Sequence, residues 1–151
     1  MEHPKSNIKK NYFKKIIVPI DGSNLSKKAA KVACYLGEQL NIKIIFFHVV
    51  NVTGIIFGTG EVTYDPEMND VLREHGKSIL NSFKESFSNM NVKIKTVMVE
   101  GIPDDEIIKE AKKDDLVIMG SKGQSALERI LIGSVTEKVI HHTDATVMVV
   151  R

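Results

Sequence analysis

The sequence is poor in several features that would place it in a specialised class of protein. It holds one cysteine, Cys34, and no tryptophan among 151 residues. A single thiol cannot form an internal disulfide, so we expect the reducing environment of the cytoplasm. No apolar run approaches the ~18 residues that a membrane span needs, and no apolar export signal follows Met1. The composition therefore favours neither a membrane protein nor a disulfide-rich secreted one.

The sequence also has no large excess of positive or negative charge. Lysine and arginine number 21 against 19 acidic residues, a net charge of +2. Nucleic-acid-binding domains concentrate positive charge on one surface, so we expect no nucleic acid partner. The local excess of lysine lies between Lys5 and Lys15. We interpret residues 1–13 as a flexible, solvated tail and 14–151 as one domain, with contact between the tail and an acidic partner as the lesser alternative.

What the sequence does contain is a regular alternation of apolar strands and amphipathic helices. Runs that are apolar on both faces predict buried parallel strands. Helical spacing of apolar residues predicts four main helices, and glycine or proline separates the elements. The predicted strands are residues 15–20, 43–50, 92–99, 115–119 and 146–150, and the predicted helices run from about 24 to 40, over 67–89, from Pro103, and over 134–142.

This alternation predicts an α/β fold with one five-stranded parallel sheet. Right-handed crossovers cover both faces with helices if the strand order is 3-2-1-4-5. The order then reverses between strands 1 and 4, and ligands of open α/β sheets bind outside the carboxyl ends of the strands at such a reversal. The two strand ends placed there are Pro19-Ile20-Asp21 and Met119-Gly120-Ser121.

Three glycines follow the fourth predicted strand with the spacing Gly-x2-Gly-x9-Gly-Ser. They are Gly120, Gly123 and Gly133, and Ser134 opens the last helix. Glycine permits close approach to the backbone, and N–H groups at a helix N-terminus attract anions. The pattern predicts a phosphate site formed by residues 120–123 and the amides of Gly133, Ser134 and Val135, with hydroxyl donors on Ser121, Ser134 and Thr136. Ser134 and Glu137 also match a capping box, so Ser134 has two candidate roles.

The same stretch, LVIMGSKGQSALERILIGSV, resembles the signature of the ATP-binding branch of the universal stress protein family. KKIIVPIDGS, VEGIPDDEI and the final TVMVV extend the resemblance over nearly the whole chain from Lys14. The resemblance implies a Rossmann-like fold of the adenine nucleotide alpha hydrolase type, with ATP as ligand, and leaves an accompanying Mg2+ or Mn2+ ion open. It also implies a homodimer joined through strand 5, Thr146–Val150, which as an apolar edge strand is suited to pairing.

The resemblance further assigns roles to individual side chains. Asp21 resembles the family aspartate beside the nucleotide, where it accepts a ribose hydroxyl or holds a divalent ion through water; its alternative role is a helix cap. Val49 resembles the adenine-contacting valine, and its alternative role is plain core. Lys122 meets the γ-phosphate or is a surface lysine. The full nucleotide-binding set is Pro19, Ile20, Asp21, Val49, Met119, Gly120, Ser121, Lys122, Gly123, Gly133, Ser134, Val135 and Thr136.

These expectations support three hypotheses about function. The first is an ATP-binding switch of the stress response, in which nucleotide biases the long 51–66 connection, a dimer surface or a protein partner. The second is a slow or partner-activated ATPase, although no nucleophile with its base and no metal site is evident, and no Gly-Lys-[Ser/Thr] follows the glycines. The third is a dimeric interaction module without nucleotide, which the complete glycine pattern disfavours.

Overall fold

The computed structural model describes residues 11–52, 55–56, 62–63, 65–124, 129 and 131–151. Five strands form the main sheet: β1 (Lys15–Pro19), β2 (Lys43–Val50), β5 (Ile94–Glu100), β6 (Leu116–Gly120) and β7 (Thr146–Val150). They lie in the order β5-β2-β1-β6-β7, and every neighbouring pair is parallel. The predicted order 3-2-1-4-5 is therefore confirmed.

The central strands are apolar on both faces because both faces of the sheet are covered. In β1, Ile16 and Val18 belong to one buried cluster and Ile17 belongs to the other. In β2, Phe46 and Phe47 divide in the same way, and both are almost completely buried. Successive side chains of a strand point to opposite faces, so a continuous apolar run supplies two cores at once.

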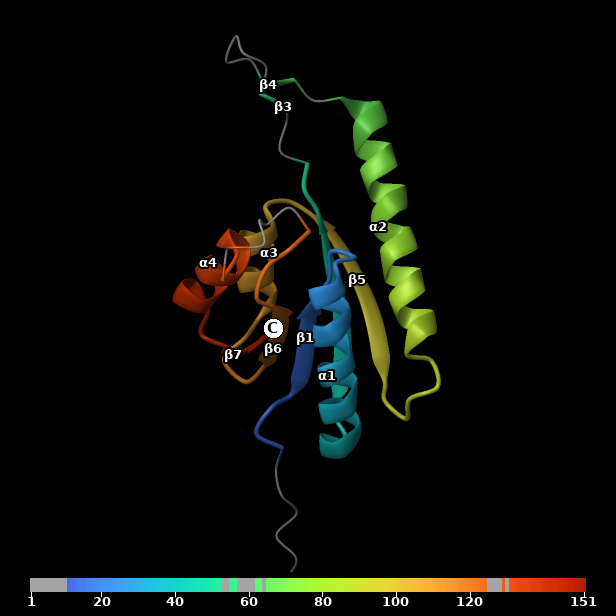
Figure 1. Cartoon of the computed structure of the whole chain (residues 1–151), viewed down its shortest axis with the longest axis vertical. Coiled ribbons are helices and arrows are strands. Elements are labelled where there is room, and N and C mark those ends of the chain that lie inside the picture. Colours follow the sequence, from blue (N-terminus) through green and yellow to red (C-terminus); the bar gives the residue numbers. More distant parts are fainter. Residues whose placement is uncertain (1–10, 53–54, 57–61, 64, 125–128, 130) are drawn as a thin grey trace, which may run out of the picture.

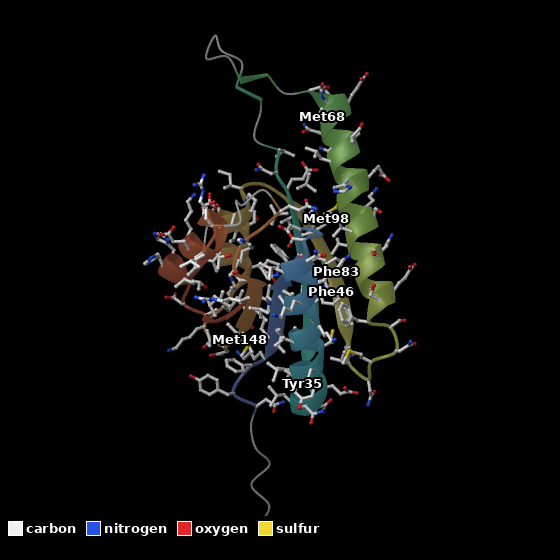
Figure 2. The ribbon with its side chains drawn as sticks, viewed as in Figure 1. Tyr35, Phe46, Met68, Phe83, Met98 and Met148 are labelled. Carbon is white, nitrogen blue, oxygen red and sulfur yellow. The ribbon has the colours of Figure 1, made fainter. Side chains whose placement is uncertain are left out.

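Four helices form the two outer layers. Helices α1 (Asn24–Leu40) and α2 (Pro66–Ser86) pack on one face of the sheet, and α3 (Pro103–Glu110) and α4 (Ser134–His142) pack on the other (Figure 1). Figure 2 shows Phe46 of β2 beside Phe83 of α2, with ring centroids 6.0 Å apart. The connections through α1 and α2 step along the sheet towards β5, and those through α3 and α4 step towards β7. Because all four crossovers are right-handed, opposite directions place the two pairs of helices on opposite faces. None of the helices described is both long and apolar enough to cross a bilayer.

The predicted helix bounds hold for α1 and α4, whereas α2 differs. It begins at Pro66 with Asp65 as its N-cap and ends at Ser86, three residues before the predicted end at 89. Met68 and His75 share helical spacing with the buried Ile79 and Phe83, which predicts that they too face the core, yet both are exposed. The reason is visible in Figures 1 and 2: the N-terminal part of α2, with Met68, extends beyond the sheet that its C-terminal part covers.

The connection between β2 and α2 contains two short strands that the sequence does not predict. β3 (Ile55–Ile56) and β4 (Val62–Thr63) pair in antiparallel register, Ile55 opposite Thr63. They lie near the N-terminal end of α2 (Figure 1). Gly54, Gly58 and Gly60 lie outside the described residues, and a role for this segment over the ligand or against a partner stays a prediction.

Candidate functional site

A cavity of about 540 Å3 opens at the carboxyl ends of β1 and β6, where the strand order reverses. It is lined by strand ends, by the turn before α1, by the glycine segment after β6 and by the first turns of α3 and α4. A larger, more open hollow of about 1270 Å3 lies near the opposite ends of the strands, around Tyr12, Asn41 and Lys93. It contains none of the predicted site residues, so volume alone does not identify the functional site.

All but one of the predicted nucleotide-binding residues line the 540 Å3 cavity. These are Pro19, Ile20, Asp21, Val49, Met119, Gly120, Lys122, Gly123, Gly133, Ser134, Val135 and Thr136. Ser121 is the exception: it is buried and absent from the lining, because its N–H donates to Val150 O at 2.8 Å and its carbonyl accepts from Gly133. The main chain of Ser121 is therefore engaged by the protein, and a contact between its hydroxyl and the ligand stays a prediction.

The cavity also has lining residues that the sequence analysis missed, namely Ser23, Ser26, Phe47, His48, Pro103, Ile107 and Gln124. Most of them are next to predicted ones in the chain or in the sheet. His48 precedes Val49, and its Nδ1 lies 2.7 Å from the carbonyl oxygen of Ile20, so it joins β2 to the end of β1. Ile107 has no local signal, because only the packing of α3 on the sheet brings it to the cavity.

Part of the cavity lining is apolar, and we call this part the apolar slot. It consists of Ile20, Phe47, Ile107 and Met119, which are buried, and Val49, which is partly buried. Such a surface fits a flat, largely apolar group such as a heterocyclic base, and its burial contributes roughly 25 cal/mol per Å2 of apolar area. Both roles considered for Val49 are compatible with this position, since it packs against the core and faces the cavity.

The N-terminus of α4 forms another part of the cavity lining. Gly133 is the N-cap of this nine-residue helix and makes no side-chain capping bond, and Ser134 is the first helical residue. The predicted capping box between Ser134 and Glu137 is therefore wrong, because the serine is one position too late to cap. Within the described residues, the N–H groups of Ser134 and Val135 have no acceptor. Two main-chain donors at the positive end of a helix thus border the cavity.

Two other expected donors are engaged by the protein itself. The N–H of Gly133 donates to Ser121 O at 2.7 Å, and the hydroxyl of Thr136 donates to Gly120 O at 2.9 Å. Each has a single proton to donate, so neither is available to a phosphate. Their predicted roles as ligand donors are wrong, and their observed role is to hold the first turn of α4 against the end of β6.

Asp21 lies between the two loops that border the cavity. One carboxylate oxygen, Oδ1, accepts the N–H of Ser23 at 2.9 Å, and Oδ2 accepts the N–H of Gln124 at 3.0 Å. The N-cap of α1 is Ser23, which accepts from the N–H of Ser26 at 3.1 Å. The alternative role of Asp21 as the helix cap is therefore wrong, because Ser23, two residues later, caps the helix.

Each signature glycine admits a close approach, and the approaching group belongs to the protein. A Cβ added to Gly120 would lie 2.9 Å from the Cβ of Leu25, and one added to Gly133 would lie 3.1 Å from the Cα of Lys122. At Gly123 the added Cβ would lie 2.7 Å from Oδ2 of Asp21. The glycines thus allow α1, α4 and the loops after β1 and β6 to meet around one cavity.

The electrostatics of the cavity rim rest on few groups. Lys122 lines the cavity and is partly buried, whereas Arg129 is exposed. In the part of the chain that the structure describes, no group of three or more His, Cys, Asp or Glu residues is placed to hold a metal ion.

Comparison with known proteins gives consistent matches. The profile of the universal stress protein family matches residues 12–151. A universal stress protein of Methanocaldococcus jannaschii is 38% identical over 143 residues, which cover 93% of this chain and 84% of that protein. The universal stress protein YxiE of Bacillus subtilis is 33% identical over 149 residues, covering 92% of this chain and 99% of YxiE.

Solved structures with this fold agree. UspA from Lactobacillus plantarum superimposes with a TM-score of 0.75 at 24% identity, over 92% of this chain and 98% of UspA. A universal stress protein in complex with cAMP has a TM-score of 0.65 at 23% identity, over 92% and 97% of the two chains. One from Archaeoglobus fulgidus in complex with dAMP has a TM-score of 0.60 at 14% identity, over 93% and 99%.

Proposed function

Because this chain belongs to the universal stress protein family, we propose that it is a cytoplasmic, ATP-binding regulatory protein of the stress response. Two structures with the same fold hold adenine nucleotides, cAMP in one and dAMP in the other. The observation that carries the proposal is the presence of an apolar slot and of two unbonded main-chain N–H groups in the lining of a single cavity. An adenine base needs a surface of the first kind, and a phosphate chain needs donors of the second kind.

The adenine lies in the slot beside Val49, Met119 and Ile20, and the phosphates extend towards Ser134 and Val135. Fixed backbone donors at a helix N-terminus bind phosphate without ordering a flexible side chain. Ser134 and Lys122 both line the cavity, and the hydroxyl of the first and the ammonium group of the second add to this binding. The volume of about 540 Å3 lies within the range of about 300–1,000 Å3 that is usual for small-molecule sites.

We assign ATP a regulatory role. A nucleotide that binds the folded state stabilises it by mass action, and it shifts any conformational equilibrium in which the two states bind it differently. Tight binding of the ground state does not by itself accelerate hydrolysis. A Mg2+ or Mn2+ ion would enter with the phosphates, held by phosphate oxygens and by water.

We also propose that the protein is a homodimer joined through β7. This strand is an edge of the sheet, and Met148 at its centre is 38% exposed. Apolar edge strands pair readily with a second strand. A second copy of the chain offers the same edge, so two copies can pair symmetrically through β7.

The test of nucleotide binding removes one donor at a time. Proline suits the first position of a helix and has no N–H, and Gly133, with φ of −76° and ψ of 159°, already has the conformation that a residue before proline needs. Ser134→Pro therefore deletes the amide donor while the helix is retained. Ser134→Ala is the matched control, because it removes the hydroxyl and keeps the amide.

We expect ATP affinity, measured by titration calorimetry, to fall by roughly 10- to 100-fold in Ser134→Pro, the range for a lost hydrogen bond to a charged group of about 1.5–3 kcal/mol. Ser134→Ala should lose only a few-fold. Chromatography of nucleotide released from denatured wild-type protein identifies the natural ligand. No released nucleotide together with no binding of added ATP would refute the proposal.

A further inference from the structure

The segment that begins at the last residue of β6, residues 120–124, is fastened to the turn after β1 by one carboxylate. We call this segment the glycine loop. Asp21 accepts the N–H of Gln124 on Oδ2 and the N–H of Ser23 on Oδ1, at 3.0 and 2.9 Å. Gln124 is 103 residues away in sequence, so this bond joins two segments that only the fold brings together. Both oxygens of Asp21 thus hold main-chain N–H groups, one in each loop.

The same carboxylate explains the glycine at position 123. A Cβ there would lie 2.7 Å from Oδ2, closer than a carbon and an oxygen can approach without one of them moving. Asp21 cannot retreat freely, because its two oxygens are held by Ser23 and Gln124. The space that a side chain would take at Gly123 is therefore filled by Asp21, and an incoming phosphate is not needed to account for that glycine.

A chain of close contacts connects this fastening to the candidate phosphate donors. Lys122 precedes Gly123, and its Cα would lie 3.1 Å from a Cβ added to Gly133, the N-cap of α4. The next two residues, Ser134 and Val135, carry the unbonded N–H groups at the cavity. The glycine loop therefore packs directly against the N-cap of α4, so a displacement of the loop is expected to displace the start of the helix.

We propose that Asp21 is a positioning residue that holds the glycine loop in the conformation shaping the nucleotide pocket, and that Gly123 is required because Asp21 occupies its side-chain space. This inference rests on the proposed function. It differs from a role in which Asp21 contacts ribose or an ion while Gly123 leaves room for phosphate. In that case the two residues act on separate parts of the ligand, whereas here they form one coupled unit.

A double-mutant cycle separates these two cases. Gly123→Ala pushes the glycine loop away from Asp21. Asp21→Ala removes the hydrogen bonds to Ser23 and Gln124, and it also removes the carboxylate that a Cβ at position 123 would meet. We expect each single variant to bind ATP at least ~10-fold more weakly, and the double variant to be no weaker than Asp21→Ala alone, as for residues in direct contact. Independent roles predict that the losses multiply to about 100-fold. Multiplied losses would overturn the inference.

A second measurement needs no nucleotide. In Asp21→Asn one carboxylate oxygen becomes an NH2 group, so one of the two N–H groups loses its acceptor. We expect the amide of Gln124 or Ser23 to exchange with solvent at least ~10-fold faster by NMR, since exchange reports local opening. Asp105→Asn is the matched control, because Asp105 is an exposed carboxylate on α3 outside the cavity. Unchanged exchange at both amides would disprove the fastening.

The two measurements also distinguish this inference from the function on which it rests. Faster exchange in Asp21→Asn without ATP binding in the wild-type protein would retain the fastening and refute the nucleotide site. ATP binding by the wild-type protein with unchanged exchange in Asp21→Asn would retain the nucleotide site and refute the fastening.

Discussion

The hydroxyl of Thr136 donates to the carbonyl oxygen of Gly120 at 2.9 Å and so ties the first turn of α4 to the last residue of β6. Thr136 is 3% exposed, which keeps water from replacing the bond. Thr136→Val has the same shape but leaves the carbonyl without this donor. Since an unsatisfied buried polar group costs about 1–3 kcal/mol, we expect urea unfolding to show a loss in that range.

Thr136→Val should also weaken ATP binding, by more than the loss of folded protein alone would explain. The bond positions the turn that carries the N–H groups of Ser134 and Val135, so displacement of the turn should weaken binding measured at a temperature where the variant is fully folded. Thr136→Ser retains the hydroxyl and is the control, with near wild-type affinity. Equal ATP affinity in Thr136→Val and the wild type would show that the bond does not position the donors.

The location of the site follows from the sequence through the order of its elements. Alternating strands and helices predict the reversal between β1 and β6, and the ends of those strands, at Pro19 and Gly120, do meet at one cavity. The apolar faces of β1 and β2 are equally evident, because full burial demands apolar side chains at every position. These features depend on patterns that span many residues, and single long-range contacts barely affect them.

What the sequence could not predict is which donors are already engaged. The bond from Gly133 to Ser121 and that from Gln124 to Asp21 join loops whose relative placement depends on the whole fold. The pairing of β3 with β4 involves two residues on each side, too few for a periodic pattern. The exposure of Met68 has a related cause, since helical spacing does not reveal where the supporting sheet ends.

Cys34 on α1 should be chemically inert in the folded protein. It is 0% exposed, and burial, with a smaller contribution from Glu38, raises the pKa of its thiol to about 12 from an ordinary 9.0. The thiolate is the form that reacts, and the raised pKa keeps its population small. Burial also keeps the alkylating reagent away from the sulfur, so both effects slow alkylation. We expect iodoacetamide at pH 8 to label it only in denaturant, whereas Ser78→Cys in a Cys34→Ala background should be labelled at once on the exposed face of α2.

The raised pKa of Cys34 also makes stability depend on alkaline pH. Between pH 9 and 12 the unfolded thiol loses its proton while the folded one keeps it, so the unfolded state is favoured as pH rises. Its stabilising contribution is complete below pH 9 and is lost towards pH 12. Urea unfolding from pH 8 to 11 should show a steeper decline for wild type than for Cys34→Ala, which lacks the thiol. Parallel declines would contradict the raised pKa.

The proposed dimer makes a specific demand on β7. Val147 packs against the cluster under α3 and α4, and Met148, pointing to the opposite face, stays 38% exposed at the edge of the sheet. Figure 2 shows Met148 at the side of the sheet away from α2. Met148→Lys places a charge where two apolar edges would meet, and charged edge residues oppose pairing. We expect the dissociation constant of the dimer to rise by roughly 10-fold or more, because this is the usual effect of losing a residue at the centre of an interface.

Sedimentation at micromolar concentration measures this outcome directly. The wild-type chain of 16.9 kDa should sediment at twice that mass, and Met148→Lys should sediment as a single chain. Val71→Lys is the matched control, because Val71 is 62% exposed on α2, the helix that packs on β2 and β5 at the other end of the sheet. A monomeric wild type would refute the dimer. A dimer that tolerates Met148→Lys as well as Val71→Lys would place the interface on a surface other than β7.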